Sequence, residues 1–324
     1  MSEKLDILIA EANGFSPEAA EILQQIGNVT LADLDRRELL EAVSLADVLW
    51  IRLRHQIDAE VMNRAARLKF IISPTTGLNH IDAEEAERRG IRIFSLRGEA
   101  KFLENVRATA ELTVLLTLAL LRQLSAATTH VLNGQWNREL FKGYELSGKT
   151  IGVIGYGRLG RLVARYFKAF DAHILAADPK LQNGTDEVAT LLPVQEVLQA
   201  SDIVTLHVDL TPATRRFFGK THFEAMNNGA YFINTARGQL VDEEALLKAL
   251  TSGRIKGAAL DVLTGEDSSG MDTHPLVAYA RQHRNLIITP HLGGCTFESM
   301  EKTESFLANR FLENFTPRKI NDET

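Results

Sequence analysis

Three charged side chains each follow an apolar run of the kind that forms a buried strand. Arg237 follows AYFINTA, Glu266 lies four residues beyond GAALDV, and His291 ends LIITPH. An imidazole titrates near neutral pH, so it can carry a proton to or from a hydroxyl group, and a neighbouring carboxylate would orient it. A planar guanidinium can hold a carboxylate and polarise the carbonyl beside it. The three residues therefore predict acid–base chemistry on an anionic substrate, at the strand ends where α/β sheets bind ligands.

A glycine-rich turn stands between a further apolar run and a helical pattern. IGVIGYGRLGR has the spacing Gly-x-Gly-x-x-Gly at Gly155, Gly157 and Gly160. The first glycine permits the tight turn, the second lets the backbone approach a pyrophosphate, and the third lets the helix pack closely on the sheet. The first turn of the helix then offers N–H groups to the phosphates. The alternative is a glycine-rich strand–helix turn without a ligand. The apolar run before the motif and the helical pattern after it favour a dinucleotide site.

Asp178 ends the next apolar run, 18 residues beyond Gly160. A carboxylate at this position can accept hydrogen bonds from the adenosine ribose hydroxyls, and it would repel the 2′-phosphate of NADP. NAD is therefore the expected cofactor. Combined with the charged trio, it predicts hydride transfer between nicotinamide and a hydroxyl-bearing carbon, with His291 as the base that takes the hydroxyl proton.

Alternating strands and helices must position these residues. Six strands are expected in the second part of the chain, the number that a doubly wound dinucleotide fold requires: residues 151–154, 173–178, 202–208, 230–236, 257–262 and 286–291. Before them we expect four strands, at residues 5–10, 46–52, 69–73 and 91–95. Helices should begin at Ser16-Pro17 and at the aspartates that open DAEVMNRAA and DAEEAERRG. A long helical stretch is expected at 104–131, and an amphipathic helix at about 296–315. This pattern predicts α/β domains with parallel sheets.

Composition limits the classes of function. With 324 residues and 45% apolar content, the chain can form two packed cores. A net charge of −6 with both signs mixed argues against nucleic-acid binding, and the single cysteine, Cys295, excludes an internal disulfide or a multi-cysteine metal site. The N-terminus has no secretory pattern, and the apolar run 112–121 is too short to cross a bilayer, so we expect a buried helix or a subunit contact there. We therefore expect a cytoplasmic protein that binds neither membrane, nucleic acid nor metal.

Four motifs in this order resemble the D-isomer-specific 2-hydroxyacid dehydrogenase family, the relatives of phosphoglycerate dehydrogenase: IGVIGYGRLGR, INTARGQLVDEEAL, GAALDVLTGE and TPHLGG. The resemblance covers nearly the whole chain. It implies two Rossmann-like doubly wound parallel-sheet domains, with an NAD-binding domain (104–295) inserted into a substrate-binding domain (1–103 plus 296–324). It places the active site in the cleft between the domains. It also implies a homodimer and, because no further domain follows the core, a short form without regulatory control.

The resemblance assigns roles to particular residues. Arg237, Glu266 and His291 would form the catalytic trio, and the backbone around Thr76, Gly77 and Leu78 would bind the substrate carboxylate. Asp261 would contact the nicotinamide carboxamide. The full set implied for the cofactor is Gly155, Tyr156, Gly157, Arg158, Leu159, Gly160, Asp178, His207, Ala236, Asp261 and His291.

Two arginines raise a separate question about the substrate. Arg52 and Arg54 stand at the end of the strand in ADVLWIRLRH, and side chains two apart on a strand share one face. Either they are solvated arginines, or they bind a second anionic group, a phosphate or carboxylate distal to the 2-hydroxy acid. The second interpretation favours a phosphorylated substrate resembling 3-phosphoglycerate.

The alternatives differ in substrate and in class. Reduction of glyoxylate or hydroxypyruvate is the closest rival, and an NAD(H)-sensing binding protein resembling the related corepressors is a more distant one. A formate dehydrogenase would normally lack the glutamate. Two stretches depart from the family pattern: residues 95–112 lack the usual Asn-Ala-Pro loop, and the loop 267–285 lacks the proline that usually follows the catalytic glutamate. Both departures could alter substrate fit.

Overall fold

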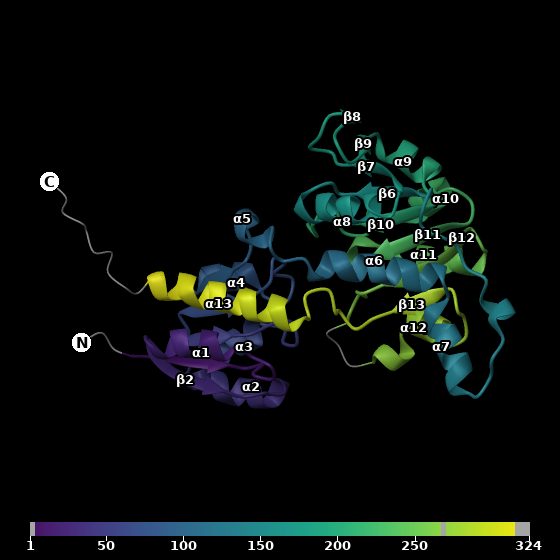
Figure 1. Ribbon diagram of the computed structural model, residues 1–324. Helices are drawn as coiled ribbons and strands as arrows, with labels where there is room; N and C mark the ends of the chain where they lie inside the picture. Colours follow the sequence, from purple (N-terminus) through teal and green to yellow (C-terminus); the bar gives the residue numbers. More distant parts are fainter. Residues whose placement is uncertain (1–3, 267–269, 315–324) are drawn as a thin grey trace. The chain divides into compact units, whose positions relative to one another are not determined.

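The computed structural model describes residues 4–266 and 270–314. They form two compact units (Figure 1). Unit 1 takes in the chain up to Val106 and from Thr296 onward, and unit 2 runs from Arg107 to Cys295. A single chain segment thus builds unit 2, whereas unit 1 is assembled from two segments.

Unit 1 is built on a five-stranded parallel sheet of order β2-β1-β3-β4-β5. Its strands are β1 (Leu5–Ile9), β2 (Gly27–Leu31), β3 (Val48–Trp50), β4 (Phe70–Ser73) and β5 (Arg92–Ser95). Its helices are α1 (Pro17–Gln24), α2 (Arg36–Ala42), α3 (Ala59–Arg64), α4 (Ala83–Arg88), α5 (Ala100–Leu103) and α13 (Phe297–Glu313). The strand order reverses between β1 and β3, which makes their carboxyl ends the topological switch point of this sheet.

The predicted helix starts of unit 1 are confirmed, and each has a side-chain cap. Ser16 Oγ accepts a hydrogen bond from the N–H of Ala19, while Asp58 and Asp82 cap α3 and α4 in the same way. These caps pair N–H groups that the first turn of a helix leaves without partners. The four predicted strands are confirmed as well, and β2 is an additional edge strand.

Helix α13 completes the core of unit 1 and packs along α1 (Figure 1). Leu307, Ala308 and Phe311 are buried in the same cluster as residues of β1 and β3. The ring of Phe311 meets the rings of Phe70 and Phe94 edge-to-face at 5.2 and 5.1 Å, a favourable aromatic arrangement. The apolar face of this last helix is therefore part of the sheet's own core.

Unit 2 is built on an eight-stranded sheet of order β13-β12-β11-β10-β6-β7-β9-β8, parallel except for the β8–β9 pair. Its strands are β6 (Thr150–Ile154), β7 (His173–Ala177), β8 (Gly184–Thr185), β9 (Thr190–Leu191), β10 (Ile203–Leu206), β11 (Ala230–Asn234), β12 (Ile255–Leu260) and β13 (Leu286–Ile288). All six predicted strands are present. The order reverses between β6 and β10, as in doubly wound dinucleotide folds.

Both faces of this sheet are covered, which explains why its strands read as continuous apolar runs. Neighbouring residues of one strand enter the cores on opposite faces of the sheet. On β11, Phe232 belongs to one core and Ile233 to the other, and on β12 the same holds for Ala258 and Ala259. The covering helices are α6 (Ala108–Leu121), α8 (Arg158–Lys168), α9 (Val194–Ala200), α10 (Lys220–Ala225), α11 (Glu243–Thr251) and α12 (Pro275–Ala280). Helix α7 (Leu124–Leu132) follows α6 and buries none of its residues. Helices α6 and α8 pack together on one face.

The long helical stretch expected over residues 104–131 is helical for most of its length, but it is divided into two helices. Helix α6 ends at Leu121, and Gln123 adopts a left-handed conformation with φ 50° before α7 begins. The axes of α6 and α7 are bent by 64° at this break. Within the described residues no one helix has the length and hydropathy to span a membrane, and only the bent α6–α7 pair meets those criteria jointly.

Candidate active site

His291 and Glu266 form a direct pair in unit 2. Nδ1 of His291 lies 2.6 Å from Oε1 of Glu266. The other carboxylate oxygen of Glu266 accepts a hydrogen bond from the N–H of Leu263 at 2.9 Å, which fixes the carboxylate. Because the carboxylate occupies Nδ1, the ring presents Nε2 as the atom that can exchange a proton with a substrate.

The backbone of the His291 loop is shaped by a buried carboxylate. Asp261 Oδ1 accepts hydrogen bonds from Thr289 Oγ1 at 2.5 Å and from the N–H of Leu292 at 2.8 Å, and Oδ2 accepts from the N–H of Gly293 at 2.8 Å. Burial raises the pKa of Asp261, and these hydrogen bonds oppose that rise. Asp261 therefore holds the loop whose His291 has a positive φ of 55°. Its implied contact with nicotinamide stays a prediction.

Arg237 lies directly beyond β11, on a turn that a neighbouring amide shapes. Asn234, 1% exposed, donates from Nδ2 to the carbonyl of Arg237 at 2.9 Å and accepts at Oδ1 from the N–H of Ala236 at 3.0 Å. Arg237 Nη1 in turn donates to the carbonyl of Ala236 at 2.6 Å. Sequence reasoning missed Asn234, although an amide inside an apolar strand run is itself a signal of a local hydrogen-bonding role.

Gly238 brings the Arg237 turn against the loop that carries Glu266. A Cβ atom at Gly238 would overlap the backbone of Leu263, so only glycine permits this approach. The three strands that carry the trio, β11, β12 and β13, are neighbours in the sheet. The structure thus joins His291 to Glu266 directly and places Arg237 on the adjoining turn.

The glycine turn after β6 has the shape that a dinucleotide needs. A Cβ atom at Gly155 would overlap the carbonyl oxygen of His207, and one at Gly160 would overlap the carbonyl oxygen of Gly155. Gly157, by contrast, has no atom within 4 Å of its Cβ position, and it is the N-cap of α8 without a capping side chain. The turn therefore leaves room beside helix N–H groups, where Arg158 and Leu159 form the first turn.

Two further residues that are predicted to bind the cofactor directly follow the two strands next to β6. Asp178 follows β7 and accepts hydrogen bonds from the N–H groups of Tyr156 at 3.0 Å and Lys180 at 2.9 Å. Each carboxylate oxygen keeps a second acceptor site for a ribose hydroxyl. His207 follows β10, and burial lowers the pKa of its imidazole to about 3, so the ring is neutral. Its Nε2 pairs with Thr205 Oγ1 at 3.0 Å, while its Nδ1 is buried without a partner. These residues fit the expected NAD.

The residues that are predicted to bind the substrate carboxylate follow β4 in unit 1. Thr75 Oγ1 donates to the carbonyl of Gly77 at 2.8 Å and lies 3.0 Å from Ser73 Oγ. The hydroxyl of Ser73 also reaches the carbonyl of Arg52 at 3.5 Å. The loop with Thr76, Gly77 and Leu78 is thereby linked to the end of β3. Whether its backbone binds a substrate stays a prediction.

Arg52 and Arg54 are held by carboxylates rather than being simply solvated. Arg52 donates from Nε to Glu304 Oε1 at 2.7 Å, and Arg54 donates from Nη1 to Asp33 Oδ1 at 2.7 Å. Glu11 accepts hydrogen bonds from the backbone N–H groups of both arginines. These contacts do not test the predicted anion binding, but they occupy donors that it would need.

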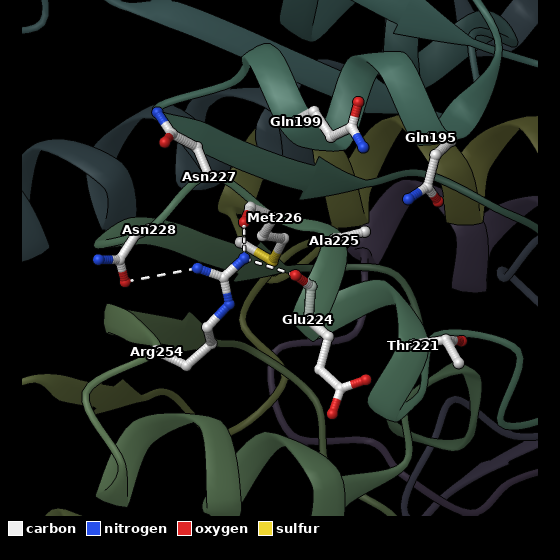
Figure 2. A pocket seen from close by; sticks show the side chains of 9 residues that line it. All are labelled: Gln195, Gln199, Thr221, Glu224, Ala225, Met226, Asn227, Asn228 and Arg254. Carbon is white, nitrogen blue, oxygen red and sulfur yellow. Dashed lines mark hydrogen bonds between the residues drawn. The ribbon is translucent and has the colours of Figure 1, made fainter.

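A cavity of about 570 Å³ in unit 2 takes no part in this site (Figure 2). It lies by α9, α10 and the segments that precede β11 and β12, whereas the trio follows the opposite, carboxyl ends of these strands. Arg254, which lines it, already donates to the carbonyls of Glu224 and Met226 and to Asn228 Oδ1. Within residues 4–266 and 270–314, no cluster of His, Cys, Asp and Glu is suited to a metal ion.

A doubly wound sheet, an open glycine turn and a histidine–carboxylate pair at the strand ends are typical of dinucleotide-binding proteins. Comparison with known proteins gives the family. Residues 114–293 match the model of the D-isomer specific 2-hydroxyacid dehydrogenase, NAD binding domain. The chain belongs to this family, and unit 2 holds its NAD-binding domain.

Individual relatives resemble the chain along most of its length. It is 37% identical to a D-3-phosphoglycerate dehydrogenase of Methanocaldococcus jannaschii over 90% of this chain and 54% of the relative, so it spans about half of that protein. It is 33% identical to a hydroxypyruvate reductase of Thermotoga maritima over 85% and 86% of the two chains. A D-lactate dehydrogenase from Aquifex aeolicus, solved with NAD and lactic acid, superposes with a TM-score of 0.79 at 26% identity over 95% and 96%.

Proposed function

We propose that the protein transfers a hydride between NAD and carbon 2 of a D-2-hydroxy acid or the corresponding 2-oxo acid. The observation that carries this proposal is the 2.6 Å contact between His291 Nδ1 and Glu266 Oε1 at the strand ends of the NAD-binding fold. When bound, the cofactor supplies or accepts the hydride. The protein's own residues must then bind the acid, orient it and move one proton.

Each member of the trio has a distinct task. His291 exchanges a proton with the substrate oxygen through Nε2, and the carboxylate of Glu266 at Nδ1 orients the ring. Arg237 binds the substrate carboxylate and polarises the neighbouring carbonyl, a task that suits a planar guanidinium. Arg237, Glu266 and His291 are thus the proposed catalytic residues.

We propose that unit 1 is the substrate-binding domain and that the backbone of Thr76, Gly77 and Leu78 holds the substrate carboxylate. The Thr75–Gly77 hydrogen bond supports this role, because it gives the loop a defined shape. The names of the relatives suggest two kinds of substrate, a phosphorylated acid resembling 3-phosphoglycerate and the smaller hydroxypyruvate or glyoxylate. Cytoplasmic localisation stays a prediction.

A panel of 2-oxo acids tests the activity. Oxidation of NADH should be followed with glyoxylate, pyruvate, hydroxypyruvate and phosphohydroxypyruvate, together with direct titration of NADH binding. Turnover of at least one acid supports the enzyme. Tight NADH binding without turnover of any acid would instead favour the sensing protein that resembles the corepressors.

We further propose a homodimer, formed through the segment that follows α6. Helix α7 has no buried residue, and the apolar side chains that it and the next turn expose include Leu132 (81% exposed) and Trp136 (88% exposed). Leu124, Val131 and Leu140 are also about half exposed. Clustered apolar residues of this kind mark interaction surfaces, and a second copy of the chain would cover them.

A further inference from the structure

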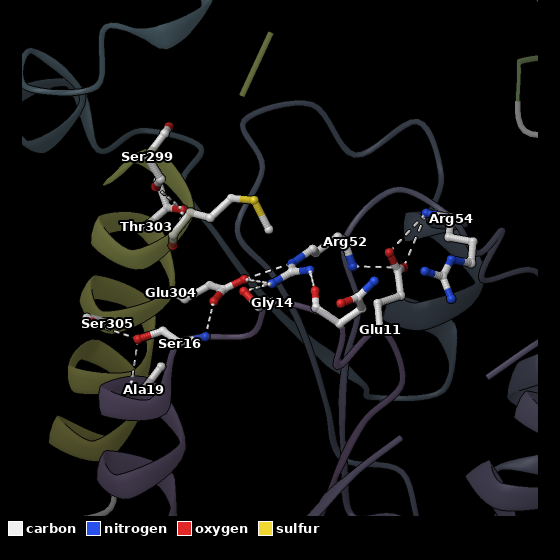
Figure 3. Close-up of polar contacts among 12 residues, drawn as sticks. Glu11, Gly14, Ser16, Ala19, Arg52, Arg54, Ser299, Thr303, Glu304 and Ser305 are labelled. Carbon is white, nitrogen blue, oxygen red and sulfur yellow. Dashed lines mark hydrogen bonds and ion pairs between the residues drawn. The ribbon is translucent and has the colours of Figure 1, made fainter. Parts of the chain in front are cut away.

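The switch point of the unit 1 sheet is a charged cluster in which an acidic side chain from α13 meets Arg52 (Figure 3). Glu304 is completely buried, and the Arg52 side chain is 17% exposed. The two are 252 residues apart in sequence. Because ligands of open α/β sheets bind beyond the carboxyl ends at the switch point, the charge of this cluster bears on what binds there.

Arg52 uses all three of its nitrogen positions on internal acceptors. Nε and Nη2 contact Glu304 Oε1 at 2.7 and 2.6 Å, Nη1 donates to the carbonyl of Asn13 at 2.8 Å, and Nη2 donates to the carbonyl of Gly14 at 3.1 Å. Glu304 Oε2 accepts a hydrogen bond from the N–H of Ser16 at 2.8 Å. The guanidinium is thus fixed and its charge is neutralised at close range.

Among the described residues that follow β1 and β3, the remaining charged side chains are also paired. Arg54 pairs with Asp33, and the buried Glu11 binds the N–H groups of Arg52 and Arg54. Two guanidinium groups are therefore set against three carboxylates among the residues that follow β1 and β3 and their direct partners. A second anionic group on a substrate would approach a cluster with a net negative charge.

We infer that Glu304 is a specificity-determining residue that occupies the anion site of Arg52, so that the enzyme prefers 2-oxo acids with an uncharged tail. The inference rests on the proposed function, since it takes the substrate carboxylate to lie at the Thr76–Leu78 loop. That loop is linked to Arg52 through the hydroxyl of Ser73. A tail that points from the loop toward the end of β3 would meet the Arg52–Glu304 pair.

Hydroxypyruvate and phosphohydroxypyruvate form the matched probe pair, because they differ only in the phosphate. The wild type should have the higher kcat/KM for hydroxypyruvate. Glu304→Gln keeps an oxygen that can accept from Ser16 but removes the charge, so it should raise kcat/KM for phosphohydroxypyruvate about tenfold or more, the usual contribution of a charge-assisted contact. Its kcat/KM for hydroxypyruvate should stay within about threefold. Arg52→Gln added to Glu304→Gln should abolish the gain.

Glu18→Gln is the control. Glu18 accepts a hydrogen bond from Ser305 Oγ in the same α1–α13 contact, but its side chain is exposed, so the substitution should change kcat/KM for neither substrate. A wild type that prefers phosphohydroxypyruvate tenfold would overturn the inference even if Glu304→Gln does not fold. An unchanged substrate ratio in a folded Glu304→Gln protein would do the same.

A binding measurement separates this inference from the proposed function. Calorimetric titration with phosphoglycolate needs no turnover, and it should show about tenfold tighter binding to Glu304→Gln than to the wild type. If the wild type reduces none of the four oxo acids of the panel, the proposed function fails, while this titration still decides the role of Glu304. Equal binding by the two proteins would show that Glu304 only fastens α13 to the sheet.

Discussion

Nδ1 of His291 lies 2.6 Å from Oε1 of Glu266, although 25 residues separate them. The contact arises because β12 and β13 are neighbouring parallel strands, so the loops that follow them meet at one edge of the sheet. The N–H of Leu263 donates a hydrogen bond to the Glu266 carboxylate, and Asp261 accepts one from the N–H of Leu292 in the His291 loop. The pair is therefore a rigid unit rather than a chance contact between two exposed side chains.

We expect the two residues to act together in catalysis. His291→Ala should lower kcat by about 10²- to 10⁴-fold, the usual contribution of a general acid or base, and leave NADH affinity near that of the wild type. Because Glu266 acts through His291, the double variant His291→Ala, Glu266→Gln should be slower than His291→Ala by no more than about threefold. Single-turnover hydride transfer measures both effects. Losses that multiply would mean that Glu266 acts independently.

Asp178 should control the choice between NADH and NADPH. Asp178→Asn keeps an oxygen for the N–H of Tyr156 but removes the charge that repels a 2′-phosphate, so the ratio of kcat/KM for NADPH to that for NADH should rise about tenfold or more. Glu187→Ala, an exposed carboxylate of the same unit, is the control and should leave the ratio unchanged. A wild type that favours NADPH would contradict the role given to Asp178.

The neutral His207 should make the protein sensitive to acid. Burial lowers its pKa to about 3 from the ordinary 6.5, so between these pH values the unfolded chain binds a proton that the folded one does not. Stability is therefore lost as the pH falls below 6.5, by up to about 1.4 kcal/mol per pH unit from this group. His207→Gln should lose less unfolding free energy between about pH 7 and pH 5 in urea titrations. The exposed His173→Gln should behave like the wild type.

The exposed segment after α6 should carry the dimer contact. Sedimentation at micromolar concentration should give a particle of twice the 36.0 kDa chain mass. Leu132→Glu or Trp136→Glu should produce monomers without loss of fold, since both side chains are exposed in the single chain. Leu45→Glu places the same charge on an exposed leucine of unit 1 and should leave the dimer intact. A wild-type monomer would contradict the proposal.

Much of the fold could be predicted because burial on both faces leaves a clear sequence signal. The six predicted strands of unit 2 are mostly apolar, and the predicted helix starts of unit 1 carry Ser or Asp caps. Strand β2 lacks that signal because it lies at the sheet edge and buries little of its surface. The break after α6 also lacks one, since Gln123 takes the left-handed conformation that glycine usually marks.

The candidate site divides in the same way. Arg237, Glu266 and His291 could be proposed from the sequence because each follows a recognisable strand, and the structure places all three beyond neighbouring strands. The supporting contacts could not be predicted, since they depend on which loops lie against each other. At Gly238, for example, the contact is with the backbone of Leu263. The pairing of Arg52 with Glu304 was equally hidden, because nothing near either residue indicates the other.

The two-segment construction of unit 1 sets an order for events on the ribosome. Residues up to Val106 emerge first, but their core lacks Leu307 and Phe311 until α13 has been made. At roughly 5–20 residues per second, the intervening unit takes about ten to forty seconds to synthesise. During that interval unit 2 can complete its fold, while the apolar face of the unit 1 sheet that α13 later covers stays exposed. A chain cut before Thr296 should accordingly keep unit 2 resistant to protease and leave the first segment open to it.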